Sequence, residues 1–160
     1  GRKMILWDGY CWAHTQYKAR ELADIKKAFD GAPLVCHPEC PKEVRDVADC
    51  VCSTEKMIKF CRENPSDKFI IATVVEMVHR LRREIPNKTF IAATSSGKPA
   101  QHCKNMLMNT PEKLLKCLED LEPRIELPKD VMDRARKPIE RMLEMSESVG
   151  RAGADSAKGA

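Results

Sequence analysis

The sequence predicts an α/β protein in which a parallel sheet is flanked by helices. Short apolar runs of strand length alternate along the chain with longer segments that carry apolar residues at helical spacing. The clearest pair is a strand at 68–73 followed by a helix at 74–85, whose apolar residues recur at spacings of four, three and four. Strands joined by helices run parallel, and the helices cover the faces of the sheet.

In the first third of the chain we expect three strands joined by two helices. Residues 4–7 (MILW) form an apolar run of strand length, and similar runs occur at 32–37 and 49–53. Thr15 can cap the first connecting helix. Pro41 suits the first turn of the second, shorter helix, because a residue in the first turn has no use for its amide hydrogen.

The next part of the chain completes the predicted sheet. Ser53 can cap a helix that precedes the strand at 68–73. Pro86 then ends the helix at 74–85, and the apolar run at 88–93 follows as a further strand. The predicted sheet is therefore built entirely from the first two thirds of the sequence.

Beyond the sheet we expect helices and a tail. Thr110 and Pro111 begin a helix with leucines on one stripe, and a last helix at 130–147 is interrupted at Pro138. The glycine-, alanine- and serine-rich end is typical of disordered segments. The sequence thus predicts an α/β domain at 1–108, a helical segment at 109–147 and a disordered tail at 148–160.

Composition excludes several classes of protein. The net charge of +4 is spread over helices in which basic and acidic residues alternate, and aromatic residues make up only 5%, so we expect no nucleic-acid binding. No apolar run approaches the roughly 18 residues of a membrane span, so we expect no membrane contact. Eight cysteines without a secretory signal predict reduced thiols in the cytoplasm. Because the chain opens within a predicted strand and lacks an initiator methionine, we expect a further segment upstream.

Polar and metal-binding side chains follow several predicted strands at the point where each strand ends. The carboxyl ends of parallel strands lie at one edge of the sheet, which we call the carboxyl edge, so these side chains should line one cleft. They are Cys11, His14, His37, Glu39, Ser53, Thr54 and Cys103.

The residues by themselves leave their roles open. Cys11 and Cys103 are either two ligands of an iron–sulfur cluster or ordinary thiols. His37 and Glu39 either bind a polar substrate and transfer protons or are satisfied by nearby backbone groups. Ser53 either helps to hold an anion at a helix N-terminus or only caps the helix. The remaining cysteines are interpreted as structural: Cys36, Cys40, Cys50, Cys52, Cys61 and Cys117.

Five runs, in this order and spacing, resemble the quinolinate synthase A family: LWDGYCWAH, HPECPKEVRDVAD, ST at the start of a helix, HRLRREIPNKTF and HCKNMLMNTPEKLLKCLE. The match extends from about Ile5 to Met145. The resemblance implies three pseudo-repeated α/β domains around a central site, each of which contributes one cysteine to a [4Fe-4S] cluster. It also implies that the domain with the third cluster cysteine is a missing N-terminal domain or a partner chain.

The resemblance assigns roles to the residues of the carboxyl edge. It implies that Cys11 and Cys103 bind the cluster. The residues implied to bind substrate are His14, His37, Glu39, Ser53 and Thr54, of which the first three are also catalytic. The implied reaction condenses iminoaspartate with dihydroxyacetone phosphate to quinolinate, in de novo NAD biosynthesis in the cytoplasm or in a plastid. We expect a partial enzyme; the alternatives are a noncatalytic metal- or redox-binding α/β module and an inactive remnant.

Overall fold

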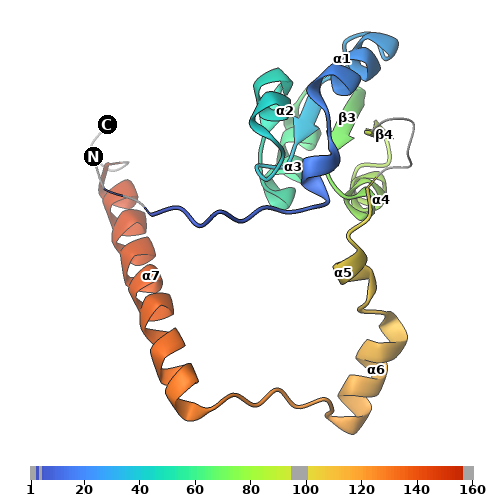
Figure 1. Cartoon of the computed structure of the whole chain (residues 1–160). Helices are drawn as coiled ribbons and strands as arrows, with labels where there is room; N and C mark the ends of the chain where they lie inside the picture. Colours follow the sequence, from blue (N-terminus) through green and yellow to red (C-terminus); the bar gives the residue numbers. More distant parts are fainter. Residues whose placement is uncertain (1–2, 4, 95–100, 157–160) are drawn as a thin grey trace. The chain divides into compact units, whose positions relative to one another are not determined.

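The computed structural model describes residues 3, 5–94 and 101–156. The chain divides into two compact units, one at Gly1–Asn109 and one at Thr110–Ala160. The first unit contains all the strands found in the described residues, and the second consists of helices and their connections (Figure 1).

Four parallel strands form the sheet, and they confirm the predicted α/β class. In chain order they are β1 (Leu34–Cys36), β2 (Cys50–Val51), β3 (Lys68–Ala72) and β4 (Thr89–Ala92). Their spatial order is β2-β1-β3-β4, so β1 and β3 lie at the centre. The register pairs Cys36 with Ala72, which brings the ends of the two central strands side by side.

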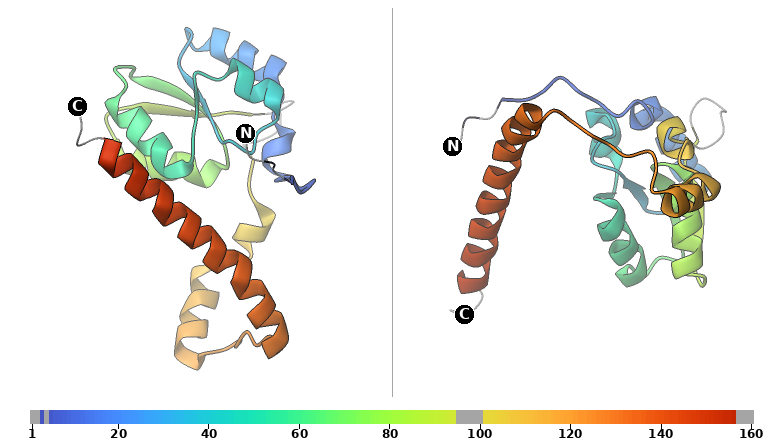
Figure 2. Two further views of the ribbon diagram at one scale, coloured as in Figure 1. Left: turned by 90° about the vertical axis from the view of Figure 1, so that its left-hand side faces the viewer. Right: turned by 90° about the horizontal axis from the view of Figure 1, so that it is seen from below.

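Helices cover both faces of this sheet (Figure 2). The side chains of β3 alternate between the faces, as the pleat of a strand requires. Phe69 and Ile71 pack in one core cluster with α3 (Thr54–Glu63) and α4 (Val75–Glu84). Ile70 and Ala72 pack in a second cluster on the other face, where α1 (Ala19–Ala28) and α2 (Lys42–Val47) contribute the buried side chains of Leu22 and Val44.

The predicted strand at 4–7 is wrong for the residues that the structure describes. Residues 5–7 belong to no strand, and Ile5 and Trp7 are 100% and 92% exposed. Residue 4 lies outside the described residues. A strand forms only by hydrogen bonding to a neighbouring strand, and every strand pairing in the described part of the chain joins β1, β2, β3 and β4 among themselves. An apolar run indicates burial, but it supplies no such neighbour.

The predicted helix start at Thr15 is also wrong. A short 3-10 turn, η1 (His14–Gln16), occupies this position, and α1 begins four residues later at Ala19. The Thr15 hydroxyl donates a hydrogen bond to the Trp12 carbonyl at 3.0 Å and so does not cap a helix. Tyr17 has an extended ψ of 142°, which separates the turn from α1.

The second unit follows α5 (Lys104–Leu107) and contains α6 (Pro111–Asp120) and α7 (Lys129–Ser156). Thr110 caps α6 as predicted, since its hydroxyl accepts a hydrogen bond from the Lys113 amide at 3.3 Å.

Helix α7 does not break at Pro138, and it continues through residues 148–156, for which disorder was predicted. Proline removes one helical hydrogen bond, but good helix formers on both sides continue the ladder. Residues 157–160 lie outside the described residues. None of the described helices is both long enough and apolar enough to cross a membrane.

Candidate active site

The loop after β1 lies against the end of β3 at the carboxyl edge. The His37 amide donates to the Ala72 carbonyl at 3.2 Å, which extends the pairing of the two strands by one hydrogen bond. Cys40 then turns back, and its thiol donates to the same carbonyl at 3.5 Å. These bonds hold the segment from His37 to Cys40 beside Thr73, the first residue after β3.

The segment around Cys11 also contacts Thr73, through His14 and Tyr17. Tyr17 is buried, and its hydroxyl donates a hydrogen bond to the Thr73 carbonyl. The 3-10 turn before Tyr17 directs His14 inward, where its side chain is only 7% exposed. Nε2 of His14 lies 2.9 Å from the Thr73 hydroxyl oxygen, so Thr73 holds both His14 and Tyr17.

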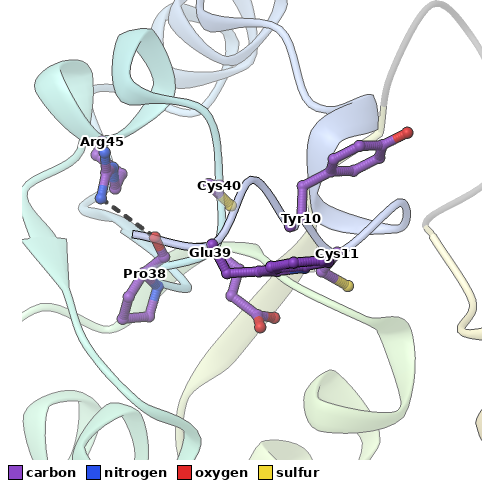
Figure 3. Close-up of a pocket in the computed structure, with 8 residues that line it drawn as sticks. Tyr10, Cys11, Pro38, Glu39, Cys40 and Arg45 are labelled. Carbon is purple, nitrogen blue, oxygen red and sulfur yellow. Dashed lines mark hydrogen bonds between the residues drawn. The ribbon is translucent and has the colours of Figure 1, made fainter. Parts of the chain in front are cut away.

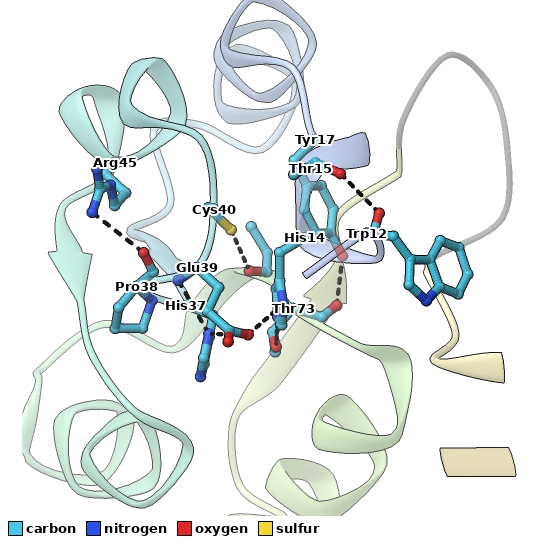
Figure 4. A network of polar contacts seen from close by, with 11 residues as sticks. Trp12, His14, Thr15, Tyr17, His37, Pro38, Glu39, Cys40, Arg45 and Thr73 are labelled. Atoms are coloured by element: carbon cyan, nitrogen blue, oxygen red, sulfur yellow. Dashed lines mark hydrogen bonds and ion pairs between the residues drawn. The ribbon is translucent and has the colours of Figure 1, made fainter. Parts of the chain in front are cut away.

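Two imidazoles and one carboxylate meet at the centre of this network (Figure 4). One oxygen of Glu39, Oε2, lies 3.2 Å from Nδ1 of His14 and 3.5 Å from Nδ1 of His37. The two imidazole rings stack with their centroids 4.5 Å apart. The Glu39 amide donates to Nδ1 of His37 at 3.3 Å, which leaves the proton of a neutral His37 on Nε2.

The surroundings favour a neutral His14. Burial lowers the pKa of His14, and the neighbouring His37 lowers it further, while Glu39 only partly opposes these effects. A neutral imidazole beside a carboxylate can accept a proton or bind a metal ion.

Cys11 and Glu39 also line an open cavity of about 530 Å³ (Figure 3). The cavity is large enough for a small-molecule ligand. Its lining residues are Trp7, Gly9, Tyr10, Cys11, Pro38, Glu39, Cys40 and Arg45. Cys11, His14 and Glu39 each offer a possible metal-ligating atom, and these atoms lie within 4.8 Å of one another.

Cys103 lies at the N-terminus of α5 and is half-buried. The ammonium of its neighbour Lys104 lies over the Trp12 ring, 5.9 Å from the centroid, so the residues that follow Cys103 and Cys11 are in contact. The residue before Cys103 is also held: His102 is 2.7 Å from a carboxylate oxygen of Glu76 in the first turn of α4. Partial burial raises the pKa of Glu76, but the hydrogen bond to His102, a backbone hydrogen bond and the nearby histidines together lower the pKa below its usual value.

Ser53 and Thr54 follow β2, at the beginning of α3. The Cys52 amide donates to the Cys36 carbonyl at 3.1 Å, so this loop runs beside the loop after β1. Ser53 is exposed, and its side chain caps no amide of α3. Neither residue lines the cavity that contains Cys11 and Glu39.

The sequence of this chain matches a known protein family. The family model described as quinolinate synthetase A protein matches residues 1–144. The chain belongs to this family. It is 38% identical over 148 residues to a quinolinate synthase of Thermosynechococcus vestitus, a match that covers 91% of this chain and 46% of the relative. It is 39% identical over 137 residues to a quinolinate synthase of Geotalea uraniireducens, covering 86% and 44%.

Membership in the quinolinate synthetase A protein family confirms the resemblance read from the sequence. A third relative, the quinolinate synthase of Prosthecochloris aestuarii, is 38% identical over 147 residues, with 91% of this chain and 46% of the relative covered. The chain thus spans about half the length of the curated relatives it matches.

The network at the carboxyl edge contains three further residues that the sequence patterns did not indicate. Thr73 directly follows β3, so the rule that selected the loops after other strands would also have selected it. Tyr17 could not be selected in this way, because it follows no predicted strand. A single tyrosine in a sequence does not show which group its hydroxyl contacts. Cys40 was interpreted as structural; it is indeed buried, but it also lines the cavity.

Proposed function

We propose that this chain supplies one part of the active site of a quinolinate synthase. The complete enzyme would condense iminoaspartate with dihydroxyacetone phosphate to quinolinate, in NAD biosynthesis. The observation that carries the proposal is the contact of Glu39 with His14 and His37 beside the cavity, in a chain that belongs to the quinolinate synthetase A protein family.

The cysteines of the chain differ in their fitness to bind a [4Fe-4S] cluster. Iron binds thiolates, and burial disfavours the thiolate. Burial raises the pKa of both Cys52 and Cys61 to about 12, so these thiols are poor ligands at neutral pH. Cys11 and Cys103 are half-buried, and their neighbours Trp12 and Lys104 are in contact. We therefore propose Cys11 and Cys103, the two that the family resemblance indicates, as the ligands that this chain would offer.

Two cysteines provide two of the ligands of a cubane cluster, so the proposal requires a third cysteine from a further domain or chain. When bound, a cluster with one open iron position supplies a Lewis acid for substrate oxygens. The partial coverage of the relatives supports the need for a further segment, because more than half of their length has no counterpart in the match.

The remaining chemistry falls to side chains of this chain. Condensation with loss of water and phosphate requires several proton transfers, which a neutral imidazole and a carboxylate can perform. His14, kept neutral by its surroundings, would accept a proton at Nδ1, and His37 would donate one from Nε2. The Glu39 carboxylate, which contacts both rings, would fix their orientation and transfer protons with them. Ser53 and Thr54, at the N-terminus of α3, would bind a substrate carboxylate or phosphate.

The test is quinolinate formation by a two-part assembly. The chain would be combined under anaerobic conditions with the portion of the Thermosynechococcus vestitus relative that the match leaves uncovered, and quinolinate would be measured by chromatography. Glu39→Gln should lower turnover about 100-fold or more, since it removes a proton-transferring carboxylate. Glu43→Gln is the matched control, because Glu43 lies exposed on α2. Equal turnover in the two variants would overturn the proposed role of Glu39. A noncatalytic module would give an assembly that binds iron and forms no quinolinate.

A further inference from the structure

Three residues of the carboxyl edge already resemble a mononuclear metal site. The ligating atoms of Cys11, His14 and Glu39 lie within 4.8 Å of one another, whereas Cys103 is not part of this group. In a tetrahedral zinc site, bonds of about 2.0–2.3 Å place the ligand atoms roughly 3.5 Å apart. Glu39 can close this difference without disturbing the core, because its side chain is 55% exposed.

The second observation concerns the buried nitrogen of His14. The side chain is 93% buried, since only 7% of it is exposed, and Nδ1 has no hydrogen-bond partner among the described residues. The Glu39 oxygen is 3.2 Å away but lies outside hydrogen-bonding geometry. Buried polar atoms without a partner are rare in folded proteins, so this nitrogen calls for an explanation.

Neither neutral tautomer of His14 gives both ring nitrogens a suitable hydrogen-bond partner. With the proton on Nε2, the ring donates to the Thr73 hydroxyl, and the Nδ1 lone pair faces a carboxylate oxygen. With the proton on Nδ1, that N–H has no acceptor in suitable geometry. A cation between Nδ1 and Glu39 removes the conflict. The bond from Nε2–H to Thr73 is then the outer contact that metal-bound histidines usually make.

We propose that Cys11, His14 and Glu39 bind a single divalent first-row metal ion, with Zn²⁺ as the best match. One sulfur, one nitrogen and one oxygen donor suit this borderline ion, and three protein ligands would leave a fourth position for a small ligand. Two of the three, Cys11 and Glu39, line the cavity. The proposal needs no residue outside the chain. It goes beyond the proposed function and does not rest on it: Cys11 would bind either this ion or the cluster, so the two exclude one another.

Cobalt titration of the intact chain tests this site. Co²⁺ replaces Zn²⁺ in such sites, and a thiolate ligand gives a charge-transfer band in the near ultraviolet together with visible bands of a four-coordinate ion. The chain should bind one Co²⁺ with both sets of bands, and added Zn²⁺ should abolish them. The titration is run under anaerobic, reducing conditions, and circular dichroism checks that each variant is folded.

The variants separate this site from its neighbours. Cys11→Ser and Glu39→Gln should each raise the Kd for Co²⁺ at least 10-fold, and Cys11→Ser should remove the charge-transfer band. Thr73→Val, which removes the outer contact of His14, should raise the Kd by about 10- to 100-fold. Cys103→Ser and Cys117→Ser should leave the Kd and the spectrum unchanged. Because Glu39 is exposed, Glu39→Gln retains the fold even if a variant at a more buried position does not.

Three results would overturn the inference. These are the absence of saturable Co²⁺ binding, an unchanged Kd in Glu39→Gln, and a Kd raised as much by Cys103→Ser as by Cys11→Ser. The third would mean that the ion lies between the two cysteines. The proposed function fails separately: a two-part assembly that forms no quinolinate, with Co²⁺ binding intact in the chain, would refute the enzyme and leave the metal site standing.

Discussion

Removal of one buried hydroxyl, in Tyr17→Phe, should destabilise the first unit measurably. Tyr17 is 1% exposed and Thr73 is 2% exposed, so neither partner of their hydrogen bond can turn to water instead. Burial raises the pKa of Tyr17 far above its ordinary value, which keeps the phenol protonated as a donor. Loss of the bond leaves the Thr73 carbonyl without this donor, at a cost of about 1–3 kcal/mol. In a domain of about 100 residues, each kcal/mol lowers Tm by about 4–8 °C.

Thermal and urea unfolding, followed by circular dichroism, measure this loss. Tyr10→Phe is the matched control, because it makes the same chemical change at a side chain that is 78% exposed. The control should stay within about 0.5 kcal/mol of the unmodified chain. If Tyr17→Phe were as stable as Tyr10→Phe, the hydroxyl would not hold Thr73, and the account of how the segment around Cys11 is fixed to the sheet would be refuted.

Two further predictions concern other parts of the chain. Asp49→Asn should lower stability at pH 7 by about 1–2 kcal/mol, since the carboxylate accepts hydrogen bonds from Lys26 and from the Leu34 amide. Burial raises the pKa of Asp49, but these bonds lower it more, so the native pKa is below the unfolded value. The stabilisation is therefore present above the unfolded pKa, about 4, and is lost as pH falls through the native pKa. Urea unfolding would contradict this if the free energies of unfolding of the variant and the unmodified chain differed equally at pH 7 and pH 2. Residues 131–145 of α7 should exchange amide hydrogens faster than β3 in the monomeric chain, because Ile139 and Leu143 of this helix are about half exposed. Hydrogen exchange followed by mass spectrometry would contradict this if these residues were as protected as β3.

Strand prediction succeeded where an apolar run had neighbours to pair with. Residues 68–73 and 88–93 became β3 and β4 because each lies beside another strand of the same sheet. The apolar run predicted at 4–7 forms no strand in its described part, residues 5–7. Strand pairing needs a second segment, and an apolar run does not show whether that segment is there. Helix boundaries depended in the same way on particular contacts: Thr15 bonds to the Trp12 carbonyl, a choice that its residue type does not reveal.

The location of the site in the fold was easier to predict from the sequence than the contacts between its side chains. Parallel topology alone implies that residues after β1 and β3 meet, and the His37 amide donates to the Ala72 carbonyl. It does not explain why His14, which precedes β1, contacts Thr73 across 59 positions of sequence. Topology does not show that one carboxylate oxygen of Glu39 contacts two imidazoles. That detail depends on the turn between His37 and Cys40, which is fixed by hydrogen bonds to the Ala72 carbonyl.

We propose that the carboxyl edge of this sheet provides two cluster ligands and thus part of a quinolinate synthase active site. Anaerobic reconstitution of the two-part assembly with iron and sulfide, followed by the absorption spectrum and iron content, tests it most directly. The reconstituted assembly should be brown and should contain about four iron atoms. Cys11→Ser and Cys103→Ser should each abolish the colour, and Cys61→Ser and Cys117→Ser should retain it. Equal iron content in all four variants would contradict the claim.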